Sequence, residues 1–94
     1  MDITKKSETF SFVDTDDMYK ITGDFTNDVN GTLNINFQVY TAEDNNIGSG
    51  NYYQYNAKDN VNFNINCPEL DRENIVSSVN SVINNLLNYI NTKE

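Results

Sequence analysis

The sequence predicts an α+β domain: an antiparallel meander sheet of four to five strands with one C-terminal helix packed on one face. Two periodicities predict it. Apolar residues recur at every second position up to Cys67, and at every third or fourth position after Pro68. These are the periods of a half-buried strand and of an amphipathic helix. The length fits one domain, so residues 1–94 should form a single two-layer unit, with strands within 8–67 and a helix over about 70–91.

Alternation marks candidate strands over residues 8–13, 18–27, 33–39, 51–57 and 61–67. A strand with one apolar and one polar side packs one face and hydrates the other, which is typical of antiparallel sheets. In the fourth strand, Tyr53 and Tyr55 are expected to face the core and Tyr52 to face out. Residues 42–50 contain two glycines and no alternation, so they are expected to form the longest loop.

Side-chain parity predicts how the second and third strands pair. A three-residue loop over 29–31 places Phe25 opposite Ile35 and keeps both apolar faces on one side of the sheet. It also puts Gly31 where a left-handed residue is needed. A two-residue turn would set Phe25 against an asparagine, so we expect the longer loop.

The C-terminal helix is expected to begin near Asp71, which can cap it, with Leu70 packing on Ile75 as a hydrophobic staple. Its serines and asparagines are poor helix formers, so the helix needs the sheet as a packing partner. One broad stripe supplies that contact: Ile75, Val76, Val79, Val82, Ile83, Leu86, Leu87 and Ile90.

The sequence contains few residues suited to catalysis or metal binding. The chain has no histidine and one cysteine, Cys67, which falls on the inward face of the last strand. The acidic turn at residues 14–17 fails the EF-hand pattern, because Tyr19 and Phe25 stand where a glycine and a glutamate belong. No feature orients the remaining carboxylates for acid–base work. We therefore expect no enzyme, no metal site and no cofactor.

The single cysteine predicts a reducing, cytoplasmic setting. No apolar run follows the first residues, so no signal peptide is expected. No stretch approaches the roughly 18 apolar residues that span a bilayer, so no membrane association is expected.

Six basic and fourteen acidic residues give a net charge of −8, which repels nucleic acids and anionic lipid and favours a basic protein surface. We predict a non-catalytic interaction domain, an acidic and nucleic-acid-mimicking inhibitor or adaptor of the kind that phages and other mobile elements encode. The same charge also serves solubility. The candidate partner-binding residues are outward tyrosines and turn or strand acids: Tyr40, Tyr52, Glu43, Asp44, Asp14, Asp16, Asp17 and Asp24.

The alternative is a self-assembling structural or chaperone-like subunit, which leaves homo-oligomerisation open. Few charges guard the predicted strands, so a sheet edge could join copies of the chain. The predicted outward face is flat and neutral, and it could instead meet a partner protein, a second copy or a glycan. Its residues are Thr22, Thr32, Asn34, Asn36, Gln38, Asn62, Asn64 and Asn66.

Overall fold

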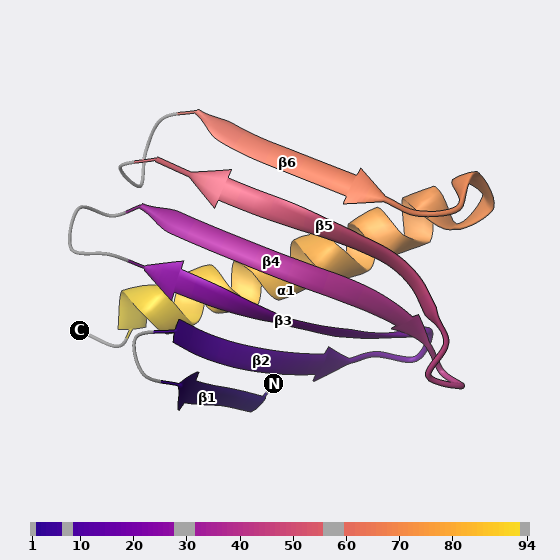
Figure 1. Ribbon diagram of the computed structural model, residues 1–94, viewed down its shortest axis with the longest axis horizontal. Coiled ribbons are helices and arrows are strands. Elements are labelled where there is room, and N and C mark those ends of the chain that lie inside the picture. Colours follow the sequence, from indigo (N-terminus) through magenta and orange to yellow (C-terminus); the bar gives the residue numbers. More distant parts are fainter. Residues whose placement is uncertain (1, 7–8, 28–31, 56–59, 93–94) are drawn as a thin grey trace.

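The computed structural model describes residues 2–6, 9–27, 32–55 and 60–92. Six antiparallel strands form one sheet in the order β1-β2-β3-β4-β5-β6, and one long helix, α1, crosses a single face of it (Figure 1). The α+β meander is confirmed, with one strand more than the upper expected number. The elements are β1 (Asp2–Lys6), β2 (Thr9–Thr15), β3 (Tyr19–Asn27), β4 (Leu33–Thr41), β5 (Asn46–Gln54), β6 (Val61–Asn66), the 3₁₀ turn η1 (Glu69–Asp71) and α1 (Arg72–Thr92).

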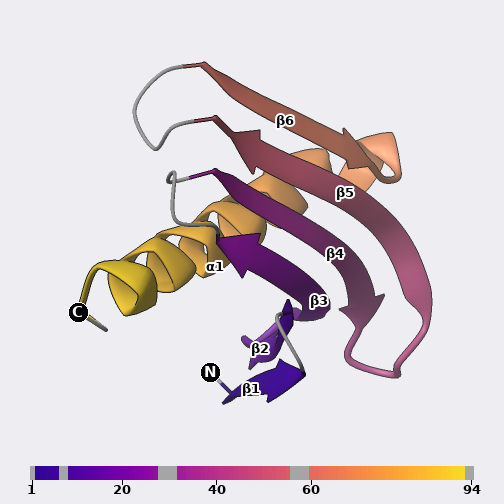
Figure 2. The same cartoon turned by 60° about the vertical axis from the view of Figure 1, so that its left-hand side comes forward.

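The sheet twists strongly, and α1 lies diagonally across one side of it (Figure 2). The side chains between the two layers form one continuous core. In the described part of the chain the buried apolar residues are Phe12, Tyr19, Ile21, Phe25, Leu33, Ile35, Phe37, Val39, Tyr52, Ile75, Val79, Val82, Ile83 and Leu86. No helix among the described residues is both long and apolar enough to cross a membrane.

The predicted pairing of β3 with β4 is confirmed. Phe25 lies opposite Ile35, Gly23 opposite Phe37 and Ile21 opposite Val39. The loop proposed over 29–31 lies outside the described residues. The register nevertheless follows from the requirement that both apolar faces point toward α1.

Strand β1 was not predicted. It pairs with β2 along its whole length, with Ile3 opposite Phe12. Ile3 is half-buried and is the only large apolar residue in the segment DITKK. A single apolar residue produces no alternation, so sequence periodicity cannot mark this edge strand.

The long loop expected over residues 42–50 is wrong, because β5 already begins at Asn46. A short turn precedes it, in which the Asp44 amide donates to the Thr41 carbonyl oxygen over 2.9 Å. Gly48 and Gly50 lie opposite Val39 and Phe37 on the side of the sheet that faces α1. These inward positions have no side chain, so the strand shows no apolar alternation over its first half.

The orientation predicted for the β5 tyrosines is also wrong. Tyr52 pairs with Ile35, is 9% exposed and packs edge-on against Phe63 with ring centroids 6.0 Å apart. Tyr53 lies opposite Asn34 instead, and Tyr55 is 57% exposed beyond the strand end. From Gly48 onward, the residues of β5 that face α1 are the even-numbered ones. Gly48 and Gly50 occupy the first two of these positions, and Tyr52 occupies the next.

Helix α1 buries most of the predicted stripe, with Ile75 and Leu86 fully covered, whereas Val76, Leu87 and Ile90 are only partly buried. It begins at Arg72 directly after η1, which contains Asp71. The hydrophobic staple is wrong, because the Leu70 side chain is 97% exposed and cannot pack on Ile75. Tyr89 lay outside the predicted stripe, yet its ring packs against Phe25 with centroids 6.4 Å apart.

Candidate functional site

Acidic side chains from three separate connections gather at one end of the sheet. Strands of a meander alternate in direction, so the β2–β3, β4–β5 and β6–α1 connections all lie at the same end (Figure 1). We call this region the acidic end. Its described carboxylates are Asp16, Asp17, Glu43, Asp44, Glu69 and Asp71 from the connections, and Glu73 from the first turn of α1.

Among the described residues, two cations accompany these seven carboxylates, and both are paired. Lys20 Nζ lies 2.6 Å from Asp44 Oδ1, and Arg72 Nε lies 2.8 Å from Glu69 Oε2. The hydrogen bond and charge of Glu69 raise the pKa of Arg72. Seven negative and two positive charges leave this region at −5, whereas the whole chain carries −8. Asp17, Glu43 and Glu73 are exposed, so their charge faces solvent.

Asp16 fastens the β2–β3 turn to the helix. Its Oδ1 accepts hydrogen bonds from the backbone amides of Met18 and Tyr19, at 2.8 and 2.7 Å, and its Oδ2 accepts one from Ser78 Oγ at 2.7 Å. Burial raises the pKa of Asp16, but the hydrogen bonds outweigh it, so this pKa lies below its usual value. Asp14 Oδ2 accepts a longer contact, 3.5 Å, from Asn85 Nδ2. Both carboxylates point toward α1, so their visible role is structural.

Replacing Ser78 by alanine is expected to lower the free energy of unfolding by about 1 kcal/mol at neutral pH, because the bond that it removes is partly exposed to solvent. Because the folded-state pKa of Asp16 is lowered, its stabilisation is present above the unfolded-state value, near 3.8, and disappears as pH falls through the folded-state value. The gap between wild type and Ser78→Ala should therefore close in acid. Urea unfolding from neutral pH to below pH 3.8 measures it. Ser77→Ala, at the neighbouring exposed position, is the control. A stability difference between wild type and Ser78→Ala that did not change with pH would contradict the bond between Ser78 and Asp16.

Tyr19 packs beneath this turn. Its side chain is 5% exposed, and burial raises the pKa of its hydroxyl. The charges of Asp71 and Asp16 raise that pKa further. The tyrosine therefore remains neutral and anchors the acidic end to the core without changing its charge.

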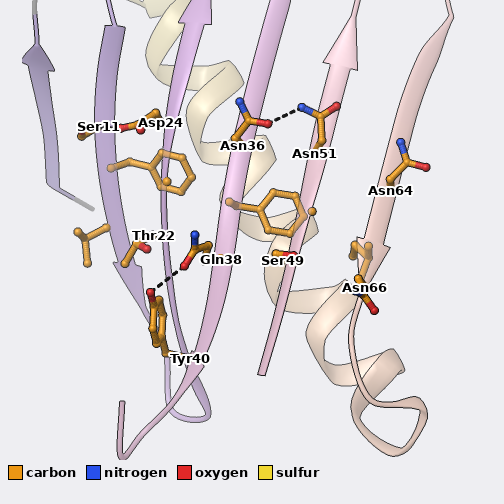
Figure 3. A pocket seen from close by; sticks show the side chains of 16 residues that line it. Ser11, Thr22, Asp24, Asn36, Gln38, Tyr40, Ser49, Asn51, Asn64 and Asn66 are labelled. Atoms are coloured by element: carbon orange, nitrogen blue, oxygen red, sulfur yellow. Dashed lines mark hydrogen bonds between the residues drawn. The ribbon is translucent and has the colours of Figure 1, made fainter. Parts of the chain in front are cut away.

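The face of the sheet turned away from α1 is hollowed rather than flat. A twisted sheet is concave along one diagonal, and here the concavity forms an open hollow of about 810 Å³. Figure 3 shows the side chains that line it. Polar side chains from neighbouring strands line its centre. One row follows the strand pairing from β2 to β6: Ser11, Asp24, Asn36, Asn51 and Asn64.

Most of this lining is neutral and partly hydrogen-bonded to itself. Asn51 Nδ2 lies 2.8 Å from both Asn34 Oδ1 and Asn36 Oδ1. Ser11 Oγ donates to Asp24 Oδ1 over 2.7 Å. Among the described lining residues, Asp24 is the one carboxylate, and none is a cation. The hollow is therefore suited to neutral or weakly cationic groups.

Tyr40 lies between the hollow and the acidic end and has contacts toward both. Its hydroxyl donates to Gln38 Oε1 over 2.8 Å within the hollow (Figure 3). Its ring lies under Lys20, whose Nζ is 5.4 Å from the ring centroid. Lys20 in turn pairs with Asp44. The tyrosine is half-buried and presents part of its ring beside the carboxylates.

The structure brings together only part of the predicted site. Asp16, Asp17, Glu43 and Asp44 share the acidic end, where Asp16 is bonded to Ser78 of α1, and Tyr40 borders it. Of the other candidates, Asp24 lies within the hollow, Asp14 contacts Asn85 of α1, and Tyr52 belongs to the core. The predicted site residues did not include the acids just before and at the start of α1: Glu69, Asp71 and Glu73. The signal that could have found them is the alternation of connections between the two ends of a meander.

Among the described residues, no group of three or more histidine, cysteine, aspartate or glutamate side chains is arranged to hold a metal ion. Cys67 is free and half-buried. The chain matches no protein-family model, no curated protein and no solved structure with which it was compared. Its function is therefore inferred from its own residues.

Proposed function

We propose that this chain is a non-catalytic protein-interaction domain, an acidic inhibitor or adaptor that docks its acidic end on a basic protein surface. The observation that carries the proposal is the concentration of charge: six carboxylates from three connections and a seventh, Glu73, from the first turn of α1 share one end, and the two cations described beside them are already paired. A nucleic-acid-binding cleft has the complementary charge. The lone free cysteine favours a reducing compartment such as the cytoplasm.

The acidic end is held in shape before any partner arrives. Asp16 ties the β2–β3 turn to α1 through Ser78. Thr41 closes the β4–β5 turn, because its amide donates to the Asn45 carbonyl oxygen over 2.9 Å and its hydroxyl accepts from the Asn45 amide over 3.2 Å. Preorganised groups lose less conformational entropy on binding. Long-range attraction then speeds the encounter, and Tyr40 offers an aromatic contact of the kind enriched in binding hot spots.

Two baits test the proposal by capture from a lysate of the source cells. One is the wild-type chain; the other is Asp17→Asn/Glu43→Gln, which removes two exposed charges that make no side-chain bond among the described residues. The partner should be captured by the first and lost or strongly reduced with the second. With the purified partner, we expect the association rate to fall about tenfold or more from low to high ionic strength.

The matched control is Asn80→Lys/Asn84→Lys on the exposed face of α1. It changes the net charge by the same two units, from −8 to −6, but leaves the acidic end intact. It should keep most of the association rate. Equal losses in both double variants would show that only total charge matters, and a rate independent of salt would exclude electrostatic docking.

A further inference from the structure

The two edges of the sheet are protected differently. Edge strand β1 carries Asp2, Lys5 and Lys6, and charged residues are a usual protection against pairing with another chain. Edge strand β6, with the sequence VNFNIN, carries no charge and no proline. It pairs with β5 in one unbroken register from Gln54–Val61 to Ser49–Asn66, without a bulge. One edge of the sheet is therefore open to further backbone pairing.

The side chains of β6 also remain incompletely covered. Val61 is 45% exposed, and Phe63 and Ile65 are half-buried on the side that faces α1. Asn62 and Asn64 on the opposite side are exposed. A neutral six-residue strand with alternating apolar residues and asparagines is the kind of segment that pairs readily with a copy of itself. Another strand added here would cover both the backbone edge and the apolar strip.

We propose that β6 pairs antiparallel with β6 of a second copy, so that two six-stranded sheets become one continuous sheet across a twofold axis. Charge repulsion favours antiparallel over parallel pairing of the two β6 strands. Each copy carries −8, concentrated at the acidic end. Antiparallel β6 strands place the two acidic ends at opposite ends of the joint sheet, whereas parallel strands would bring them together. The charged β1 edges then lie outermost and oppose further growth into a filament.

Side-chain parity restricts the register. Residues directly opposite each other in an antiparallel pair point to the same face, so odd-numbered residues must meet odd-numbered ones to keep the apolar strip on the helix side. A register with Phe63 opposite Phe63 of the second copy meets this condition. It places Val61 opposite the second Ile65 and Asn62 opposite the second Asn64. The amide row of the hollow, which ends at Asn64, would then continue into the second copy.

The test is the mass of the purified full chain in solution, measured by sedimentation equilibrium over a range of concentrations. We expect a species of twice 10.7 kDa that dissociates on dilution. Asn62→Lys/Asn64→Lys sets like charges opposite each other across the twofold axis and should raise the dissociation constant about tenfold or more. Asn80→Lys/Asn84→Lys carries the same charge change on α1 and should dimerise like wild type.

A charge swap keeps the test decisive. Asn62→Asp/Asn64→Asp should also dimerise at least about tenfold more weakly alone, and mixing it with the lysine variant should restore a dimer of wild-type stability. A wild-type chain that stays monomeric, a lysine variant that dimerises as well as its α1 control, or a mixture that does not associate would each overturn the β6 pairing. The measurement uses no partner protein, so its result is independent of docking at the acidic end.

Discussion

Replacing Phe25 by alanine is expected to lower the free energy of unfolding by about 3–5 kcal/mol. Phe25 is 1% exposed and lies where β2, β3 and α1 meet. Its ring is stacked on Phe10, with centroids 5.1 Å apart, and meets Phe12 at 6.3 Å and Tyr89 at 6.4 Å. Truncation leaves a cavity between the two layers and removes three aromatic contacts at once.

Urea unfolding followed by circular dichroism measures this loss. Domains of this kind are stable by about 5–15 kcal/mol, so the variant should lie near the limit of folding. Tyr55→Ala is the control, because Tyr55 is 57% exposed and its removal should change stability by no more than about 0.5 kcal/mol. Similar losses in the two variants would mean that Phe25 is not in the core.

Replacing Gly23 by alanine should destabilise the domain by about 3 kcal/mol, at the upper end of what overpacking costs. A Cβ atom at Gly23 would overlap the Asn36 carbonyl oxygen and come within 2.9 Å of Phe37 Cα. Both atoms belong to the backbone of β4, so no side-chain rotation can relieve the contact. The central β3–β4 pair would have to move apart.

The same unfolding experiment tests this glycine. Thr22→Ala, on the opposite face of the same strand, should cost no more than about 1 kcal/mol. A Gly23→Ala variant as stable as Thr22→Ala would show that β3 and β4 are not so closely apposed. Gly50 occupies the equivalent position on β5, because its Cβ would overlap the Phe37 ring and the Asn64 carbonyl oxygen. Phe37 thus lies between two positions at which a side chain does not fit.

Apolar periodicity and parity were enough to predict the helix, the strand that became β6, and the β3–β4 register. They failed where the inward position has no side chain. In β5, Gly48 and Gly50 leave the inward positions without apolar side chains, so the first half of the strand was not predicted. The orientation of Tyr52 was predicted wrongly for the same reason. The register also shifts between Val39 and Tyr40, which parity counting across the turn cannot anticipate.

The acids of the candidate site were visible in the sequence, but their grouping was not. Asp17 and Glu43 are far apart along the chain, and their turns lie at the same end of the sheet because two strands, β3 and β4, separate them. Asp16 looked equivalent to Asp17, yet its two oxygens are already occupied by backbone amides and Ser78. The hollow depends on the twist of the whole sheet, which no local pattern of residues encodes.

The docking proposal is tested most directly by finding which surface of the chain a captured partner protects from hydrogen–deuterium exchange. Hydrogen–deuterium exchange of the chain, alone and with its partner, should show slower exchange at the three connections of the acidic end, around residues 16–18, 42–45 and 69–71. Exchange along the exposed face of α1 should stay unchanged. Protection confined to that face of α1, with the acidic end exchanging as in the free chain, would contradict docking through these carboxylates.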